Sequence, residues 1–122
     1  MTSEGTDYFE RLNNTEREDF YKRLRQELAI AIPVNLERVT SNKNVEIDSS
    51  VTPQQIFLSI NIEKNEDERG MFINLATKNL DELIKHKSIT VIGFGKSSRY
   101  LDQVYGYKLI RKNFHSYENH LF

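Results

Sequence analysis

The sequence predicts an α/β fold in which two strands alternate with two helices, and three patterns within residues 55–113 support it. Apolar residues alternate from 56 to 62, which is typical of a strand with one buried face. Apolar stripes at three- and four-residue spacing over 72–84 and 101–109 predict two helices. A β-branched apolar run over 88–94 predicts a buried strand between them. Strands joined through a helix favour a parallel pair with a right-handed crossover.

The N-terminal part of the chain predicts a flexible segment followed by a helix. Residues 1–14 are polar, and we expect them to be flexible. Thr15 and Glu18 have the spacing of a capping box, which predicts a helix over 15–32 that Pro33 ends. Its inner face comprises Phe20, Leu24 and Leu28, with Tyr21 beside them.

Between this helix and the βαβα core of 55–113 lies a possible hairpin over 34–47. Its turn residues, 41–44, suit a reversal of the chain, although the apolar alternation around them is weak. A length of 122 residues is that of one ordinary domain with one core. We therefore expect residues 15–122 to form a single domain.

Composition limits the classes of function that the chain can have. With no cysteine, disulfides and thiolate metal sites are excluded. The first residues resemble no secretory or transit signal, and no apolar run approaches the ~20 residues of a membrane span. We expect an intracellular protein, nuclear or cytoplasmic, without membrane contact.

The formal net charge of −1 conceals a division along the chain. Residues 1–84 carry 10 basic and 16 acidic side chains, and residues 85–122 carry 7 and 2. A polyanion would therefore be attracted to the C-terminal third. The alternative is that the two parts neutralise each other within the fold.

A glycine-rich turn, Gly93-Phe94-Gly95-Lys96-Ser97-Ser98, follows the predicted strand and precedes the predicted helix. A triphosphate-binding loop would need glycine at Thr90, and a dinucleotide fingerprint would need a third glycine at Ser98. Neither is present, so both enzymatic motifs are excluded. The turn still predicts that backbone amides approach a phosphate at the start of a helix.

Cations and aromatic residues surround this turn. We expect the nucleic-acid contacts to come from Lys85, Lys87, Gly95, Lys96, Arg99, Lys108, Arg111 and Lys112. Phosphates neutralised by such groups release counterions, so the affinity would fall steeply with salt. The residues expected either to stack on bases or to lie in a core or interface are Tyr100, Tyr107 and Phe114.

The sequence predicts no catalytic, metal or cofactor site. His86, His115 and His120 lack the i,i+4 spacing of paired metal ligands. The acidic stretch 63–68 lacks the alternating oxygen ligands of a calcium loop and suits the start of a helix instead. We find no acid–base pair or triad, and we expect the protein not to be an enzyme.

Residues 72–112 resemble the centre of the Alba family of nucleic-acid-binding proteins. The matching parts are Ile73-Asn74-Leu75-Ala76, Ile89-Thr90-Val91-Ile92, Gly95-Lys96-Ser97 and Leu109-Ile110-Arg111-Lys112, with 56–62 as the first strand. The resemblance implies a two-layer α+β sandwich, dimerisation, binding of DNA or RNA, and kinship with the Alba-type subunits of RNase P and RNase MRP.

Three positions depart from the family pattern. The usually basic loop before the first core helix is acidic at Glu66-Asp67-Glu68, Ser97 replaces alanine, and residues 114–122 supply one further strand at most. We expect the 34–47 hairpin or a partner to complete the sheet. Our hypothesis is a non-catalytic nucleic-acid-binding subunit, in a heterodimer with another subunit. The alternative is a protein–protein adaptor or structural subunit that has lost such contacts; DNA and RNA stay open.

Overall fold

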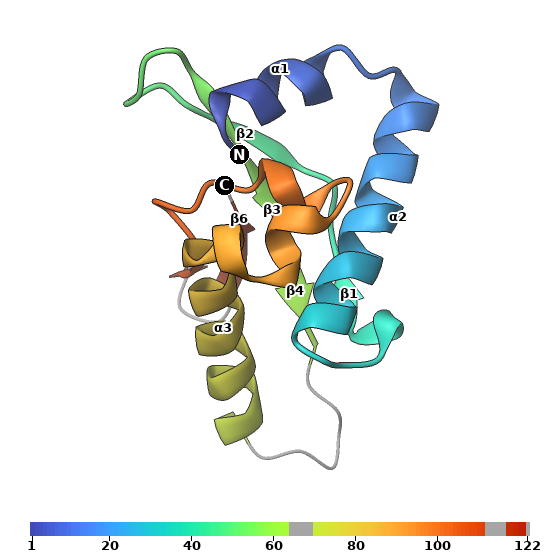
Figure 1. Ribbon diagram of the computed structural model, residues 1–122, viewed down its shortest axis with the longest axis vertical. Helices are drawn as coiled ribbons and strands as arrows, with labels where there is room; N and C mark the ends of the chain where they lie inside the picture. The colour runs from blue at the N-terminus through green and yellow to red at the C-terminus, as the bar shows by residue number, and fades with distance from the viewer. Residues whose placement is uncertain (64–69, 112–116, 122) are drawn as a thin grey trace.

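The computed structural model describes residues 1–63, 70–111 and 117–121, with the backbone alone for 70–73, 109–111 and 117–121. Within these residues are three α-helices, two small antiparallel sheets and several short 3-10 turns (Figure 1). The mixed α/β class is therefore confirmed, whereas the parallel strand pair is wrong because the described pairings are all antiparallel.

The N-terminus contains helix α1 (Ser3–Glu10), so the flexible segment predicted over 1–14 is wrong. The Thr2 side chain caps the helix by accepting a hydrogen bond from the Gly5 amide at 3.0 Å. The Phe9 ring is buried and packs edge-on against Phe20, with ring centres 5.4 Å apart. A buried aromatic contact and a cap thus help to hold a segment whose composition is mostly polar.

Helix α2 (Asn14–Ala31) confirms the helix predicted over 15–32, with Phe20, Leu24 and Leu28 buried. The capping box lies two residues earlier than predicted. The Asn13 side chain accepts from the Glu16 amide at 2.8 Å, and the Glu16 carboxylate accepts from the Asn13 amide at 3.0 Å. Asparagine ranks among the best N-cap residues, which explains its selection over the neighbouring threonine.

The strands form two sheets. The strands of the described residues are β1 (Val39–Thr40), β2 (Val45–Asp48), β3 (Gln55–Ser59), β4 (Asn61–Ile62), β5 (Tyr107–Arg111) and β6 (Tyr117–Leu121). The larger sheet has the strand order β2-β3-β6-β5, and the smaller sheet pairs β1 with β4. The alternating stretch 56–62 is confirmed as extended chain, divided at Ile60 between the sheets. The hairpin within 34–47 is wrong, because β1 pairs with β4 and β2 pairs with β3.

Helix α3 (Gly70–Lys85) confirms the second apolar stripe. Ala76, Leu80 and Ile84 from this stripe are buried in the common core, while Leu75 is 56% exposed. The regular spacing of the apolar residues fixes the buried face.

Residues 86–106 differ most from prediction. The strand expected over 88–94 is instead two 3-10 turns, η2 (Lys87–Ile89) and η3 (Val91–Phe94), and the helix expected to reach Leu109 is reduced to η4 (Ser98–Tyr100). A 3-10 turn η1 (Leu36–Arg38) also precedes β1. Gly106 adopts a positive φ of 74°, so it forms a turn into β5 rather than a helix interior.

Figure 1 places η2, η3 and η4, drawn in orange tones, between α2 and α3 and in front of the strands. Contacts of η3 with both helices agree with this view. The core combines side chains from all three helices, β3 and these turns. In the part of the chain that the structure describes, no helix combines the length and apolarity needed to cross a bilayer.

Candidate interaction surface

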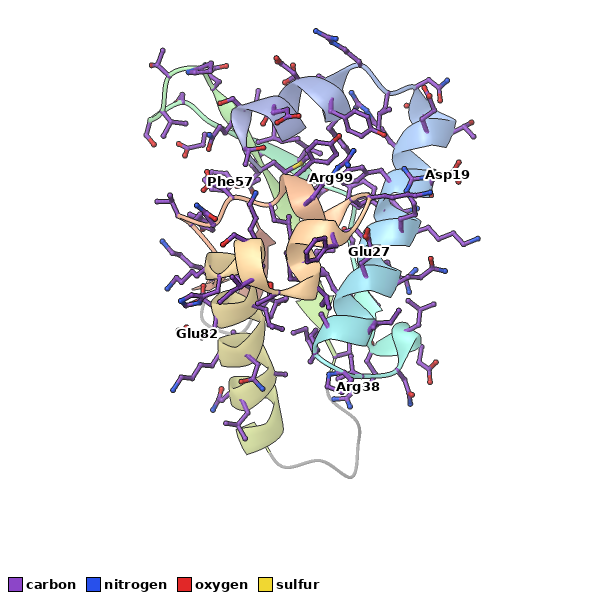
Figure 2. All side chains as sticks on the ribbon, viewed as in Figure 1. Asp19, Glu27, Arg38, Phe57, Glu82 and Arg99 are labelled. Atoms are coloured by element: carbon purple, nitrogen blue, oxygen red, sulfur yellow. The ribbon has the colours of Figure 1, made fainter. Side chains whose placement is uncertain are left out.

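The glycine turn binds an acidic side chain of the same protein. The Ser97 and Ser98 amides donate to Glu27 Oε1, at 2.8 and 3.3 Å, from helix α2 (Figure 2). Gly95 lies so close to the Glu27 carboxylate that a Cβ atom there would overlap it. The amides predicted to bind a phosphate are thus already bound to an internal anion.

The serine hydroxyls lock this turn further. Ser97 Oγ donates to the Phe20 carbonyl at 3.1 Å, and Ser98 Oγ donates to the Ile92 carbonyl at 2.7 Å. Both serines are fully buried. Thr90 Oγ1 also donates to the Leu83 carbonyl of α3, at 2.8 Å. Side-chain hydrogen bonds therefore attach the 90–98 segment to both neighbouring helices.

Two of the predicted phosphate ligands have structural partners. Lys87 Nζ donates to the carbonyls of Arg99 and Leu101, both at 2.9 Å, and burial lowers the pKa of its ammonium. Lys85 pairs with Asp81 at 2.9 Å, and the hydrogen bond to that carboxylate raises the lysine pKa. Lys87 thus connects two segments of the fold, whereas Lys85 pairs within helix α3.

The remaining described cations are exposed but lie on different elements. Lys96 follows η3, and the Arg99 guanidinium lies 4.9 Å from the Tyr100 ring centre and donates to its hydroxyl at 3.0 Å. Lys108, on β5, lies over the Tyr105 ring at 4.2 Å. Since no helix spans these residues, the predicted basic helix is wrong. For Arg111 only the backbone is described, and Lys112 lies outside the described residues.

The predicted stacking aromatics belong to the core. Tyr100 is 8% exposed and stacks on Tyr8, with ring centres 4.8 Å apart. Tyr107 is 3% exposed, and its hydroxyl donates to the Ile60 carbonyl at 2.9 Å. The core alternative is therefore confirmed for these two tyrosines and base stacking is wrong. Phe114 lies outside the described residues.

An exposed apolar surface was missed by the sequence analysis. Ile89, Val91 and Phe94 are 80, 59 and 83% exposed, although the β-branched run predicted a buried strand. Only Ile92 of this run is buried. Two residues of this run indicated turns, Thr90 between the apolar residues and Gly93 shortly after them. The apolar composition of the run nevertheless favoured the prediction of a strand.

Two clefts flank the adjoining end of α2. One, of about 420 Å³, lies between α2, α3 and Thr90; its lining comprises Ala31, Ile32, Asn79, Glu82, Leu83, His86 and Thr90. The other, of about 440 Å³, is lined by Gln26, Ala29, Ile30, Val34, Asn35 and Leu36. Ile30, which lines the second cleft, is 75% exposed. We call Ile30, Ile89, Val91, Phe94 and these two clefts the apolar surface.

The last turn of α2 explains why apolar side chains are exposed in this region. Residues 28–32 are an uninterrupted apolar run, so only part of their surface can face the core. Among the described residues, no cluster of three or more acidic or histidine side chains could hold a metal ion. No known family model, curated protein or solved structure matches this chain.

Proposed function

We propose that this protein is a non-catalytic subunit that binds a partner protein through the apolar surface. One observation carries the proposal: Ile89, Val91 and Phe94 expose most of their side chains within six residues. Large apolar side chains exposed close together along the chain are typical of protein–protein interfaces, where aromatic residues are enriched.

The rigidity of the 90–98 segment supports this function. Glu27 holds the turn from one side, and Thr90 holds it to α3 from the other. A preformed set of apolar anchors loses less conformational entropy on binding than a mobile loop does. Phe94 is thus presented on a fixed backbone, as an anchor residue needs to be.

The clefts beside Ile30 suggest how a partner would bind. Apolar side chains line both clefts, among them Ala31 and Leu83 in one and Val34 and Leu36 in the other. We infer a partner with an amphipathic helix whose apolar side chains enter these clefts, while Phe94 packs alongside. We further propose that the protein forms a heterodimer with this partner, in the nucleus or the cytoplasm.

The test replaces exposed anchors without touching the core. Val91→Ser with Phe94→Ser should weaken the complex about 30-fold or more, because an aromatic anchor commonly contributes about 2 kcal/mol. Co-purified partners would be identified, expressed, and titrated against both variants. The melting temperature should change little, since both side chains are exposed.

Val104→Ser is the matched control, because Val104 is 85% exposed in a different turn. It should leave the complex intact. If the double variant retains wild-type affinity for the identified partner, or if Val104→Ser weakens binding equally, the apolar surface is not the binding site.

Nucleic-acid binding is the second candidate, favoured by the exposure of both Lys96 and Arg99 on the same locked turn. Phosphates could reach these side chains without the turn amides. This candidate retains the Alba-type resemblance as a hypothesis about ligand class, in either DNA or RNA form. Side-chain cations alone would give binding without base specificity.

Salt dependence tests this candidate. Lys96→Glu with Arg99→Glu should weaken binding of RNA or DNA and reduce the slope of log affinity against log salt by about 2. Lys78→Glu on α3, exposed and distant in sequence, is the control. Absence of binding at low salt, with and without the protein partner, would contradict the candidate.

A further inference from the structure

The outer edge of strand β2 pairs with no other strand among the described residues. β2 stands at one end of the order β2-β3-β6-β5, and its pairing in this sheet is with β3. Figure 1 shows these two strands side by side. An edge strand presents a row of backbone donors and acceptors that another strand can use. The directions of these groups determine which residues of β2 would form the bonds.

The backbone of Ile56 on β3 shows which residues of β2 face outward. The Ile56 amide donates to Thr6 Oγ1 at 3.2 Å, and its carbonyl accepts from the Met1 amine at 2.8 Å. Both groups therefore point away from β2. Ile47 lies opposite Ile56, and opposite residues of an antiparallel pair exchange either both hydrogen bonds or none. The Ile47 amide and carbonyl thus point to the outer edge, and by alternation those of Val45 do too.

The same two residues expose apolar side chains. Val45 and Ile47 are 39 and 63% exposed. They lie opposite Leu58 and Ile56, which are buried, and opposite residues of two strands share one face of the sheet. The core face of the sheet therefore continues past the side chains that cover it. A strand added at this edge would bury both residues and bind their backbone groups.

The other face of this edge carries acidic side chains. Glu46 and Asp48 alternate with the two apolar residues, so they lie on the face opposite the core. Burial raises the pKa of Tyr105, and the charges of Asp48 and Glu46 add to this shift, which places both carboxylates near the same ring. Lys108 lies over that ring but belongs to β5, at the opposite edge of the sheet. A strand beside β2 would therefore meet carboxylates on this face.

These carboxylates disfavour a second copy of the chain as the added strand. Antiparallel pairing of two β2 strands that puts Val45 opposite Ile47 also puts Glu46 opposite Glu46 of the second copy. Pairing that puts Ile47 opposite itself puts Glu46 opposite Asp48. Like charges directly across two strands are destabilising. The occupant that suits this edge therefore carries cations at the positions facing the carboxylates.

We propose that an extended segment of a partner protein adds to β2 as a further strand, and that apolar and basic residues alternate along this segment. Its apolar side chains pack on Val45 and Ile47, whose backbone groups supply the hydrogen bonds. Its lysine or arginine side chains face Glu46 and Asp48, where opposite charges attract. These residues do not belong to the apolar surface, so the inference is independent of the proposed function.

Two peptides of equal length test the proposal, one alternating valine with lysine and the other valine with glutamate. The lysine peptide should bind about ten-fold more tightly or better, since each cross-strand pair changes from attraction to repulsion. Amide hydrogen exchange followed by NMR locates the binding. In the free protein the Val45 and Ile47 amides should exchange faster than those of Glu46 and Asp48, and the lysine peptide should slow their exchange.

Substitutions in β2 separate the backbone contribution from the charge contribution. Ile47→Pro removes an outward donor and spares the bonds to β3, because edge strands accept proline where the amide faces solvent. It should weaken the lysine peptide about ten-fold. Glu46→Gln with Asp48→Asn should weaken it about three- to ten-fold, while the amide oxygen at position 48 can still accept from the Ser50 amide.

Glu37→Gln, at an exposed position of η1, is the control for the charge variant and should bind the lysine peptide as the wild type does. Melting temperatures show whether each variant folds, and the exchange pattern with the charge variant decides the matter if Ile47→Pro does not. The proposal is overturned if the lysine peptide does not bind, binds without protecting the Val45 and Ile47 amides, or binds no better than the glutamate peptide. Slow exchange of these two amides in the free protein would also overturn it, because the edge would then already be covered by the chain itself or by a second copy.

Discussion

Glu27 determines what the glycine turn can bind. Local sequence predicted the turn and its free amides correctly, but the acceptor that uses them is 70 residues away along the chain. No periodic pattern connects two such positions, so the pairing could not be predicted. The same holds for Lys87, whose ammonium could have faced solvent as readily as the two carbonyls that it contacts.

Glu27→Gln tests this pairing. The neutral amide keeps the size of the side chain but accepts more weakly from the Ser97 and Ser98 amides. We expect a loss of about 1–2 kcal/mol in the free energy of unfolding, measured by urea titration. Glu37→Gln, at an exposed position of η1, should change it by less than about 0.5 kcal/mol. Equal effects of the two substitutions would mean that Glu27 does not hold the turn.

At the scale of elements, the long helices were predictable and the short turns were not. Helices α2 and α3 repeat their apolar spacing over several turns, so a single irregular residue does not hide the pattern. Residues 88–94 are too short for periodicity to separate a strand from successive 3-10 turns. Their composition suggested burial, whereas tertiary packing buries Ile92 alone.

The predicted N-cap of α2 is Thr15 and the observed N-cap is Asn13, so substitutions of these two residues distinguish the two starts. Asn13→Ala removes the acceptor of the Glu16 amide, and we expect it to cost about 1 kcal/mol of unfolding free energy. Thr15→Ala should cost much less, because Thr15 is exposed in the first turn and its hydroxyl is not the cap. Urea titration of both variants measures the difference, and a larger effect at Thr15 would instead support the predicted helix start at that residue.

For the whole molecule, the basic C-terminal third predicted one continuous surface. The tertiary arrangement divides it. Lys85 pairs within α3 and Lys87 contacts the carbonyls of residues 99 and 101, while Lys96, Arg99 and Lys108 lie on turns and a strand. Exposed cations were thus predictable as residue types but their grouping was not. That grouping depended on a helix that does not form.

The buried α-amino group makes the stability of the whole fold depend on pH. Met1 is fully buried and its amine donates to the Ile56 carbonyl at 2.8 Å. Burial lowers the pKa of this amine from 8.0 to about 4, although Asp102 opposes the shift. Between these values the unfolded chain binds the additional proton, so protonation favours unfolding.

We therefore expect full stability above about pH 8 and a loss of about 1 kcal/mol per unit as the pH falls towards 4. Urea titrations at several pH values measure this slope. His86→Gln replaces an exposed histidine beside Glu82 and should leave most of the slope in place. A free energy of unfolding that is constant from pH 8 to 6 would show that the amine stays protonated in the fold.

The stacked pair Tyr8 and Tyr100 joins the first helix to the last 3-10 turn, with its rings 19° from parallel. The chain contains no tryptophan, so tyrosine dominates its absorption in the near ultraviolet. Two closely stacked rings in a fixed, asymmetric geometry couple their transitions and produce circular dichroism in that range. The protein therefore carries its own optical reporter of whether the N-terminal helix is docked, and this signal can be followed without any added label.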